Sequence, residues 1–259
     1  MTRLSNLSRS IEGSVAFITG AASGIGKATA QLFVDEGARV AIVDSNHSAL
    51  EMAAKGIRDA GGEVLAIPAD CSDREAITQA VERSARHFGR LDIVINNAGV
   101  VRLEAFGGEN FDHNWEISLA VMVTAQQWII RSALPWLYKA EYPRIINIAS
   151  TEALGATSHN SAYITAKHAS LGLTRALAVE LGKAGITVNA VCPGPVRTGI
   201  TEVIPDQDKQ SFADKRTALR RYGDPEEISH IILSLVMPAA SFITGAAIPV
   251  DGGLMIRNA

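Results

Sequence analysis

Short β-branched runs alternate with longer helical patterns along this whole sequence, and no other feature constrains its fold as strongly. Seven runs have the length and composition of strands: 14–19, 39–43, 63–67, 91–95, 143–149, 186–191 and 246–250. Six stretches between them have the apolar spacing of helices: 24–36, 46–60, 73–88, 111–138, 161–184 and 225–236. Such alternation is typical of βαβ units, and the nearly continuous apolar character of the strands indicates helices on both faces of the sheet. We therefore expect a single α/β domain over residues 1–259, with a doubly wound parallel sheet of seven strands flanked by helices.

Composition excludes several classes of protein. With 47% apolar residues among 259, the chain has enough apolar material for a large core and is not a disordered protein. Its 24 basic and 27 acidic residues give a net charge of −3, which offers no basic surface to nucleic acid or to a membrane. Cys71 and Cys192 lie far apart, and neither they nor the histidines have metal-ligand spacing, so we expect no disulfide framework and no metal. The absence of an apolar signal segment or of a long apolar run predicts a cytoplasmic protein.

Three stretches depart from the regular alternation. The predicted helices 111–138 and 161–184 are apolar on more than one side, which indicates either subunit contacts or deeply buried central helices. The stretch 193–224 is irregular and carries mixed charges. Because long loops in compact domains are often functional, we interpret it as a substrate lid.

A glycine-rich turn follows the first predicted strand and opens a helix. It reads Thr19-Gly20-Ala21-Ala22-Ser23-Gly24-Ile25-Gly26. Glycines let the backbone approach a pyrophosphate, whose charge is stabilised by the free N–H groups at the start of the helix. The spacing differs from the common dinucleotide fingerprint, but a strand before it and a helix after it support the same role. The expected cofactor contacts of this turn are Gly20, Ser23, Gly24, Ile25 and Gly26.

An acidic residue ends the second predicted strand. Asp44 lies 18 residues beyond Gly26, where a carboxylate accepts hydrogen bonds from both ribose hydroxyls. A 2′-phosphate would meet this negative charge with no arginine directly after it, so the expected cofactor is NAD rather than NADP. Alternatively, Asp44 caps the following helix, and the two roles are compatible. Asp70 and Cys71 end the third strand, where the adenine is expected to lie.

Three polar residues have the spacing of a catalytic group. Ser150 ends the fifth predicted strand, and Tyr163 and Lys167 follow on one face of the next helix because they are four residues apart. A neighbouring ammonium and a positively charged nicotinamide both favour the phenolate form of a tyrosine. Tyr163 is therefore the expected general acid/base, with Lys167 lowering its pKa and binding the ribose, and with Ser150 positioning the substrate oxygen.

Together these motifs resemble the short-chain dehydrogenase/reductase family over nearly the whole chain. The resemblance also includes Asn96-Asn97-Ala98-Gly99, Pro193-Gly194 with Thr198, Ile243-Thr244-Gly245 and Val250-Asp251-Gly252-Gly253. It implies a Rossmann-like domain, hydride transfer between nicotinamide and an alcohol/carbonyl pair, and a homotetramer (or homodimer) built on the two long helices. It further implies that Asn97, Ala98 and Gly99 line the ribose side, and that Val196 and Thr198, beside Pro193, hold the carboxamide.

One position departs from that family. Where the family carries an asparagine that holds a relay water, this chain has Met122, whose thioether donates no hydrogen bond. Three interpretations stay open: a relay through Ser118 and water, an enzyme slowed in proton exchange, or a catalytically impaired NAD(H)-binding sensor or structural subunit. A lyase or dehalogenase on the same fold is opposed by the complete glycine turn and Asp44.

The sequence thus predicts an NAD-dependent oxidoreductase acting on a secondary alcohol or its ketone. Glu152 and Gly194 are the candidate substrate contacts, and a carboxylate at position 152 favours a polyol, a sugar or an amine-bearing substrate over an acyl chain. The particular substrate and the direction of the reaction stay open.

Overall fold

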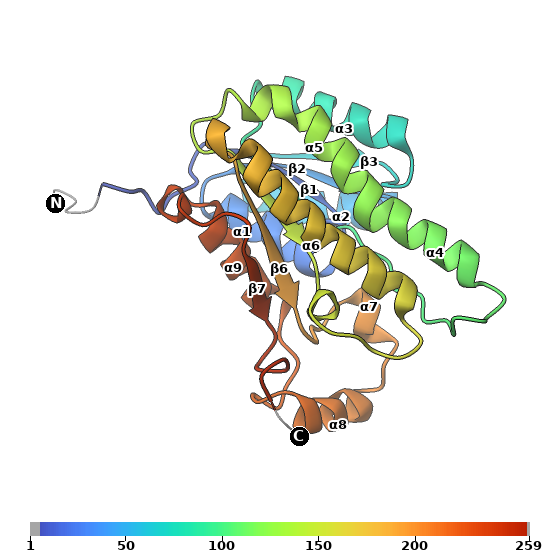
Figure 1. The fold of residues 1–259 in the computed structure, drawn as a ribbon. Helices are drawn as coiled ribbons and strands as arrows, with labels where there is room; N and C mark the ends of the chain where they lie inside the picture. The colour runs from blue at the N-terminus through green and yellow to red at the C-terminus, as the bar shows by residue number, and fades with distance from the viewer. Residues whose placement is uncertain (1–5, 258–259) are drawn as a thin grey trace.

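Seven parallel strands form one sheet in a computed structural model that describes residues 6–257 (Figure 1). The strands are β1 Val15–Thr19, β2 Arg39–Asp44, β3 Val64–Pro68, β4 Ile93–Asn96, β5 Arg144–Ile148, β6 Thr187–Pro193 and β7 Ala247–Val250. Their order across the sheet is β3-β2-β1-β4-β5-β6-β7, so the winding reverses between β1 and β4. The predicted fold class, a doubly wound parallel sheet of seven strands, is confirmed.

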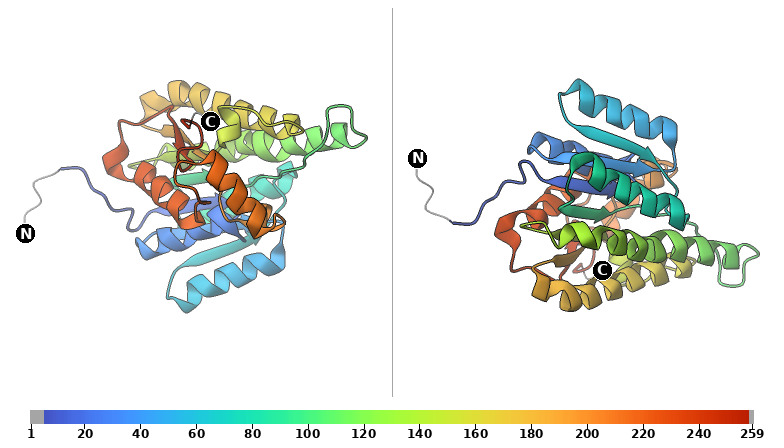
Figure 2. Two further views of the ribbon diagram at one scale, coloured as in Figure 1. Left: turned by 90° about the horizontal axis from the view of Figure 1, so that it is seen from below. Right: turned by 90° about the horizontal axis from the view of Figure 1, so that it is seen from above.

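Alternate residues of each central strand belong to two separate hydrophobic layers. In β1, Val15 and Phe17 pack into one layer, whereas Ala16 and Ile18 pack into the other. The views from above and below show helices on both sides of the sheet (Figure 2). One face is covered by α1 Gly24–Asp35, α2 His47–Asp59 and α9 Pro225–Val236, and the other by α3 Arg74–Phe88, α4 Phe111–Leu119, α5 Ala125–Leu137 and α6 Ser161–Leu181. Burial on both faces explains why the strands are apolar throughout.

The predicted helix 111–138 is interrupted. A π-helical turn, Ala120–Thr124, separates α4 from α5 and contains Met122. Phe111–Leu137 is by length and composition apolar enough to cross a membrane, but 44% of its most apolar window is buried inside the protein. Here α5 packs against α3 and α4 packs against α6, as in the helical layer of a packed domain.

The stretch 193–224 is not irregular, contrary to the prediction. It contains α7 Gly199–Glu202 and α8 Asp206–Arg216. Ala213 is the only buried residue of α8, so this helix has no apolar stripe by which to recognise it. The end of the chain holds α8 in place: Arg257 Nη1 donates to Asp214 O (2.9 Å) and to Thr217 O (2.6 Å). Figures 1 and 2 show α8 beside this end of the chain.

Both edge strands carry a proline. Gly194 N donates to Val250 O, so the backbone groups of Val250 face β6. The backbone groups of successive strand residues point to opposite sides, so those of Pro249 in β7 face the free edge of the sheet. On the other edge, Ala69 N donates to Asp44 O, so the backbone groups of the preceding residue, Pro68 of β3, face away from β2. Proline has no backbone donor, and edge positions of this kind are where a sheet accommodates it.

Candidate active site

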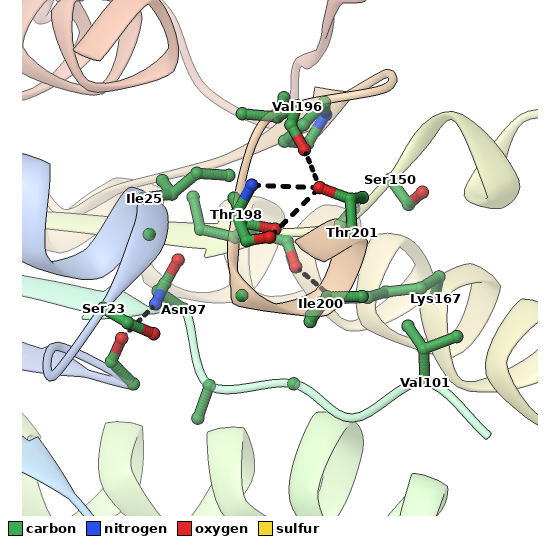
Figure 3. Close-up of a pocket in the computed structure, with 18 of the residues that line it drawn as sticks. Ser23, Ile25, Asn97, Val101, Ser150, Lys167, Val196, Thr198, Ile200 and Thr201 are labelled. Carbon is green, nitrogen blue, oxygen red and sulfur yellow. Dashed lines mark hydrogen bonds between the residues drawn. The ribbon is translucent and has the colours of Figure 1, made fainter. Parts of the chain in front are cut away.

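A cavity of about 390 Å³ opens at the carboxyl ends of the central strands. The predicted site residues that line it are Gly20, Ser23, Gly24, Ile25, Asp44, Asn97, Ala98, Gly99, Ser150, Tyr163, Lys167, Pro193, Gly194, Val196 and Thr198. They come from both halves of the sheet and meet beside the point where the strand order reverses, which is where open α/β sheets bind ligands. Figure 3 shows the residues from α1, β4, β5, α6 and α7 facing one another.

Six further residues line the cavity that were not named individually from the sequence, although three of them fall within the stretch 193–224 that was interpreted as a lid. They are Val101, Ile148, Ala149, Gly199, Ile200 and Thr201. Ile148 and Ala149 directly precede Ser150, so they could have been predicted as cavity residues from their position at the end of the fifth strand. Gly199, Ile200 and Thr201 belong to α7, whose position the sequence pattern did not reveal.

The glycine turn is held in a narrow space. Gly20 has a positive φ of 64°, and a Cβ at this position would lie 2.8 Å from Asn97 Nδ2. A Cβ at Gly26 would lie 2.3 Å from Gly20 O, so Gly26 faces the turn and not the cavity. Close approach of α1 to the turn therefore requires glycine at both positions.

The start of α1 fits an anionic group. Ser23 is the N-cap residue, and its side chain makes no capping hydrogen bond to the helix. The first turn of α1 carries no acidic residue, so no negative side chain of that turn balances the positive dipole end and the free N–H groups that border the cavity. The pyrophosphate of a dinucleotide fits this position.

Asn97 fastens the end of β4 to the glycine turn. Its Nδ2 donates to Thr19 O (2.8 Å) and to Gly20 O (3.0 Å). The backbone N–H groups of Asn97 and Ala98 both donate to Thr19 Oγ1, at 3.0 and 3.1 Å. The two strand ends that flank the cavity are therefore joined by four hydrogen bonds.

Asp44 borders the cavity beside the glycine turn. Its Oδ2 accepts from Ala22 N (3.2 Å) and its Oδ1 accepts from Asn46 N (2.9 Å). Asn46 is the N-cap of α2, because its side chain accepts from Ala49 N. The capping role considered for Asp44 thus belongs to Asn46, while Asp44 holds the glycine turn and borders the cavity.

Asp70 and Cys71 do not line this cavity. Asp70 Oδ1 accepts from both the backbone and the hydroxyl of Ser72, each at 2.8 Å. Burial raises the pKa of the Cys71 thiol to about 12, and the nearby charges of Asp70 and Asp44 add to the effect. Cys71 is therefore an unreactive thiol at neutral pH.

Ser150 and Lys167 are held by specific backbone groups. Ser150 Oγ accepts from Glu152 N (3.1 Å) at the start of the short 3₁₀ turn Thr151–Ala153, and its O–H is left to donate to Tyr163 or to a bound molecule. Lys167 Nζ donates to Ile148 O (2.7 Å) and lies 5.5 Å from the centre of the Tyr163 ring. The hydroxyl, the phenol and the ammonium therefore converge on one end of the cavity.

The environment of these groups changes their proton affinities. Burial raises the pKa of Tyr163, a hydrogen bond with Ser150 opposes this, and the negative charge of Glu152 adds to it. Burial lowers the pKa of Lys167 from 10.5 to about 8, although Cys192 opposes this change. Burial thus shifts both groups toward their uncharged forms, although a lysine with a pKa of about 8 is still mostly protonated at neutral pH, and a nearby positive charge favours the phenolate.

Met122 lies under the catalytic end of the cavity. It is fully buried. A Cβ at Gly99 would lie 3.6 Å from Met122 Sδ and 3.7 Å from Lys167 Nζ, so both atoms border the space behind Gly99. Ser118 is also buried, on α4 before the π-helical turn.

Glu152 does not line the cavity either. Its Oε1 accepts from Thr157 Oγ1 (2.7 Å), and its Oε2 is buried with no hydrogen-bond partner among the described residues. Within residues 6–257, no group of three or more His, Cys, Asp or Glu side chains is arranged to bind a metal ion.

Comparisons with known proteins identify relatives over nearly the whole chain. A family model described as enoyl-(acyl carrier protein) reductase matches residues 20–255. The chain is 35% identical to 3-oxoacyl-(acyl-carrier-protein) reductase FabG of Thermotoga maritima over 95% of this chain and 99% of the relative. It is 36% identical to meso-2,3-butanediol dehydrogenase of Serratia marcescens over 93% of this chain and 94% of the relative. The solved structure of L-sorbose reductase from Gluconobacter frateurii, complexed with NADPH and L-sorbose, superposes with a TM-score of 0.90 at 30% identity, covering 96% of this chain and 99% of that one.

Proposed function

Because the chain belongs to the short-chain dehydrogenase/reductase family of oxidoreductases, we propose that it transfers a hydride between NAD and a secondary alcohol or its ketone. The observation that carries this proposal is the convergence of Ser150, Tyr163 and Lys167 at one end of the cavity whose other end is bordered by the glycine turn and Asp44. Relatives named for a diol and for a sorbose support a small-molecule alcohol or ketone as substrate.

The residues around the cavity fit a nicotinamide dinucleotide. The start of α1, which has no acidic residue in its first turn, suits the negatively charged pyrophosphate. Asn97–Gly99 and Lys167 border the part of the cavity proposed for the ribose. Val196 and Thr198 border the place proposed for the carboxamide. When bound, the nicotinamide supplies the acceptor or donor of the hydride.

The protein's own part in the reaction is to hold the substrate oxygen and move its proton. The Ser150 hydroxyl, which lies beside Tyr163, orients that oxygen by donating to it. Tyr163 takes the hydroxyl proton during oxidation and returns it during reduction. Lys167 stabilises the phenolate electrostatically and is held in place by its bond to Ile148 O. General acid–base assistance of this kind is typically worth about 10²–10⁴-fold in rate.

The cofactor is proposed to be NAD. Asp44 borders the cavity, and no Lys, Arg or His nitrogen of the described residues forms an ion pair with it. A 2′-phosphate at this position would meet an uncompensated carboxylate, whereas ribose hydroxyls would donate to it.

A second candidate function is that of an NAD(H)-binding sensor or structural subunit. The observation that favours it is Met122, a group without a donor, buried beside Lys167. The presence of Ser150, Tyr163 and Lys167 together favours the dehydrogenase.

Tyr163→Phe separates these two functions. We measure NADH formation with a panel of secondary alcohols, polyols, sugars and hydroxyacyl thioesters, using the native protein and the variant. The dehydrogenase predicts turnover that is lost in Tyr163→Phe while NADH binding, followed by fluorescence, is kept. Binding without turnover on any member of the panel would support the sensor.

Asp44→Ala tests the choice of cofactor. Removing the carboxylate should weaken NAD binding and relax discrimination against NADP. Asp59→Ala is the matched control, because Asp59 is an exposed acid on α2 that does not line the cavity and should leave the NAD/NADP ratio unchanged. An unchanged ratio in Asp44→Ala would mean that the ribose lies elsewhere.

A further inference from the structure

The catalytic end of the cavity has apolar side walls. Figure 3 shows Val101 and Ile200 at the same end as Ser150 and Lys167, on elements that approach from different sides. The side chain of Ile200 projects from α7 and is 53% exposed, so it is available to contact a bound molecule. These walls offer van der Waals contact to a carbon skeleton and no hydrogen-bonding group.

The described residues that line the cavity offer a substrate no unoccupied basic side chain. Among the described residues that line the cavity, Lys167 is the only basic one. Its Nζ is buried and donates to Ile148 O, and the proposed function assigns its remaining donors to the cofactor ribose and Tyr163. A carboxylate or phosphate on a substrate would therefore be desolvated without a counter-charge.

Glu152 adds a negative charge next to the same place. It follows Ser150 by two residues, and its backbone N–H donates to Ser150 Oγ. Among the described residues no basic nitrogen lies within ion-pair distance of its carboxylate, and Oε2 has no donor at all. Burial is the main cause of the raised pKa of Tyr163, and the negative charge of Glu152 adds a smaller contribution in the same direction.

We propose that this site selects uncharged, apolar-flanked secondary alcohols and ketones, and that Glu152 is the residue that excludes anionic substrates. The proposal rests on the dehydrogenase function proposed above and names its substrate class. Glu152 acts through the field at the catalytic end and not by touching the substrate. Like charges held a few ångströms apart in a partly buried site repel strongly, because little water screens them.

The test uses two ligands of the same shape that differ in charge. Hydroxycyclohexanecarboxamide and hydroxycyclohexanecarboxylate are compared by kcat/KM in the native protein, in Glu152→Gln and in Glu82→Gln. Glu82 is an exposed acid on α3 that does not line the cavity, so its variant has the same change in net charge outside the site. We expect the native protein to prefer the amide at least about tenfold, and Glu152→Gln to raise kcat/KM for the carboxylate about tenfold with little change for the amide.

A second measurement does not depend on turnover. The corresponding oxo-amide and oxo-carboxylate are titrated into the NADH complex, and binding is followed by nicotinamide fluorescence. The same charge preference, lost in Glu152→Gln and kept in Glu82→Gln, supports the proposal even if the chemical step is slow. Equal binding of both ligands by the native protein, or a preference unaltered in Glu152→Gln, would overturn it. Absence of turnover with every alcohol would instead count against the dehydrogenase function.

Discussion

At the scale of single residues, the burial of the Lys167 ammonium should make cofactor binding depend on pH. Its pKa is lowered to about 8 by burial, so the ammonium is present below that pH and is lost as the pH rises through it. Because the proposed ribose contact needs the charged form, we expect NADH affinity to be constant below about pH 7 and to fall across pH 8 to 9. Fluorescence titration at a series of pH values measures this.

Lys167→Met is the control for that pH dependence. The thioether side chain keeps much of the length of lysine and has no proton to lose in this range. Its NADH affinity should be lower at neutral pH and should not change across the same interval. A native protein whose affinity is flat from pH 7 to 9 would contradict the assignment of the ribose contact to Lys167.

Met122 is the second residue whose role is open to direct measurement. Met122→Asn places an amide beside Lys167 and should leave NADH affinity unaltered and turnover equal or higher.

A buried amide without full hydrogen bonding costs about 1–3 kcal/mol, so the thermal midpoint of Met122→Asn should fall. Val121→Asn, at the neighbouring buried position of the same π-helical turn, should lower the midpoint without raising turnover. A Met122→Asn chain that does not fold would mean that Met122 serves only as core.

At the scale of elements, the turn between β1 and α1 is the most sterically constrained. Gly26→Ala adds a methyl group 2.3 Å from Gly20 O, which a backbone atom cannot avoid without moving the turn. We expect NADH affinity to drop at least about tenfold and the thermal midpoint to fall. NADH titration and thermal unfolding of the same preparation test both effects.

Gly56→Ala is the matched control for this prediction. Gly56 lies inside α2, and a Cβ there has nothing within 4 Å. Alanine is favoured over glycine in a helix interior by about 1 kcal/mol, so this variant should be slightly more stable and bind NADH normally. Equal losses in both variants would show that general helix effects, and not the contact with Gly20, explain the result.

The sequence predicts an element well where burial imposes a pattern, and poorly where it does not. The central strands are buried on both faces, so apolar runs such as the one that contains Val15 and Phe17 reveal them. In α8 only Ala213 is buried, so nothing in the apolar pattern marks that helix. The π-helical turn at Met122 inserts into a continuous helical pattern, and its position depends on packing between segments far apart in sequence.

The same reasoning applies to the candidate site. Residues at strand ends, such as Asp44 and Ser150, could be anticipated because parallel strands bring their carboxyl ends to one edge. Ile200 could not, because its place in the cavity depends on how α7 folds over the sheet. Glu152 was expected to contact the substrate, but Thr157 holds one oxygen of its carboxylate and the other is buried.

At the scale of the whole molecule, the stretch 193–224 is proposed to act as a lid in which α7 moves and α8 does not. No residue of α7 is buried, whereas α8 is tied to Arg257. Hydrogen–deuterium exchange should therefore be faster in α7 than in the last turn of α8, and NADH should slow exchange at 196–201. Arg257→Ala should speed exchange in α8 alone. Uniform exchange along the stretch, unaffected by NADH, would argue against a lid.

The prolines at the two sheet edges bear on how this protein behaves when concentrated. An open sheet is a template on which a further strand from another molecule can grow, and this is a route to fibrous aggregates. Pro249 and Pro68 each leave a gap in the row of donors that such a strand would need. Each edge of the sheet thus lacks one backbone donor, which weakens pairing with a strand of another copy and should disfavour fibril growth in concentrated solutions.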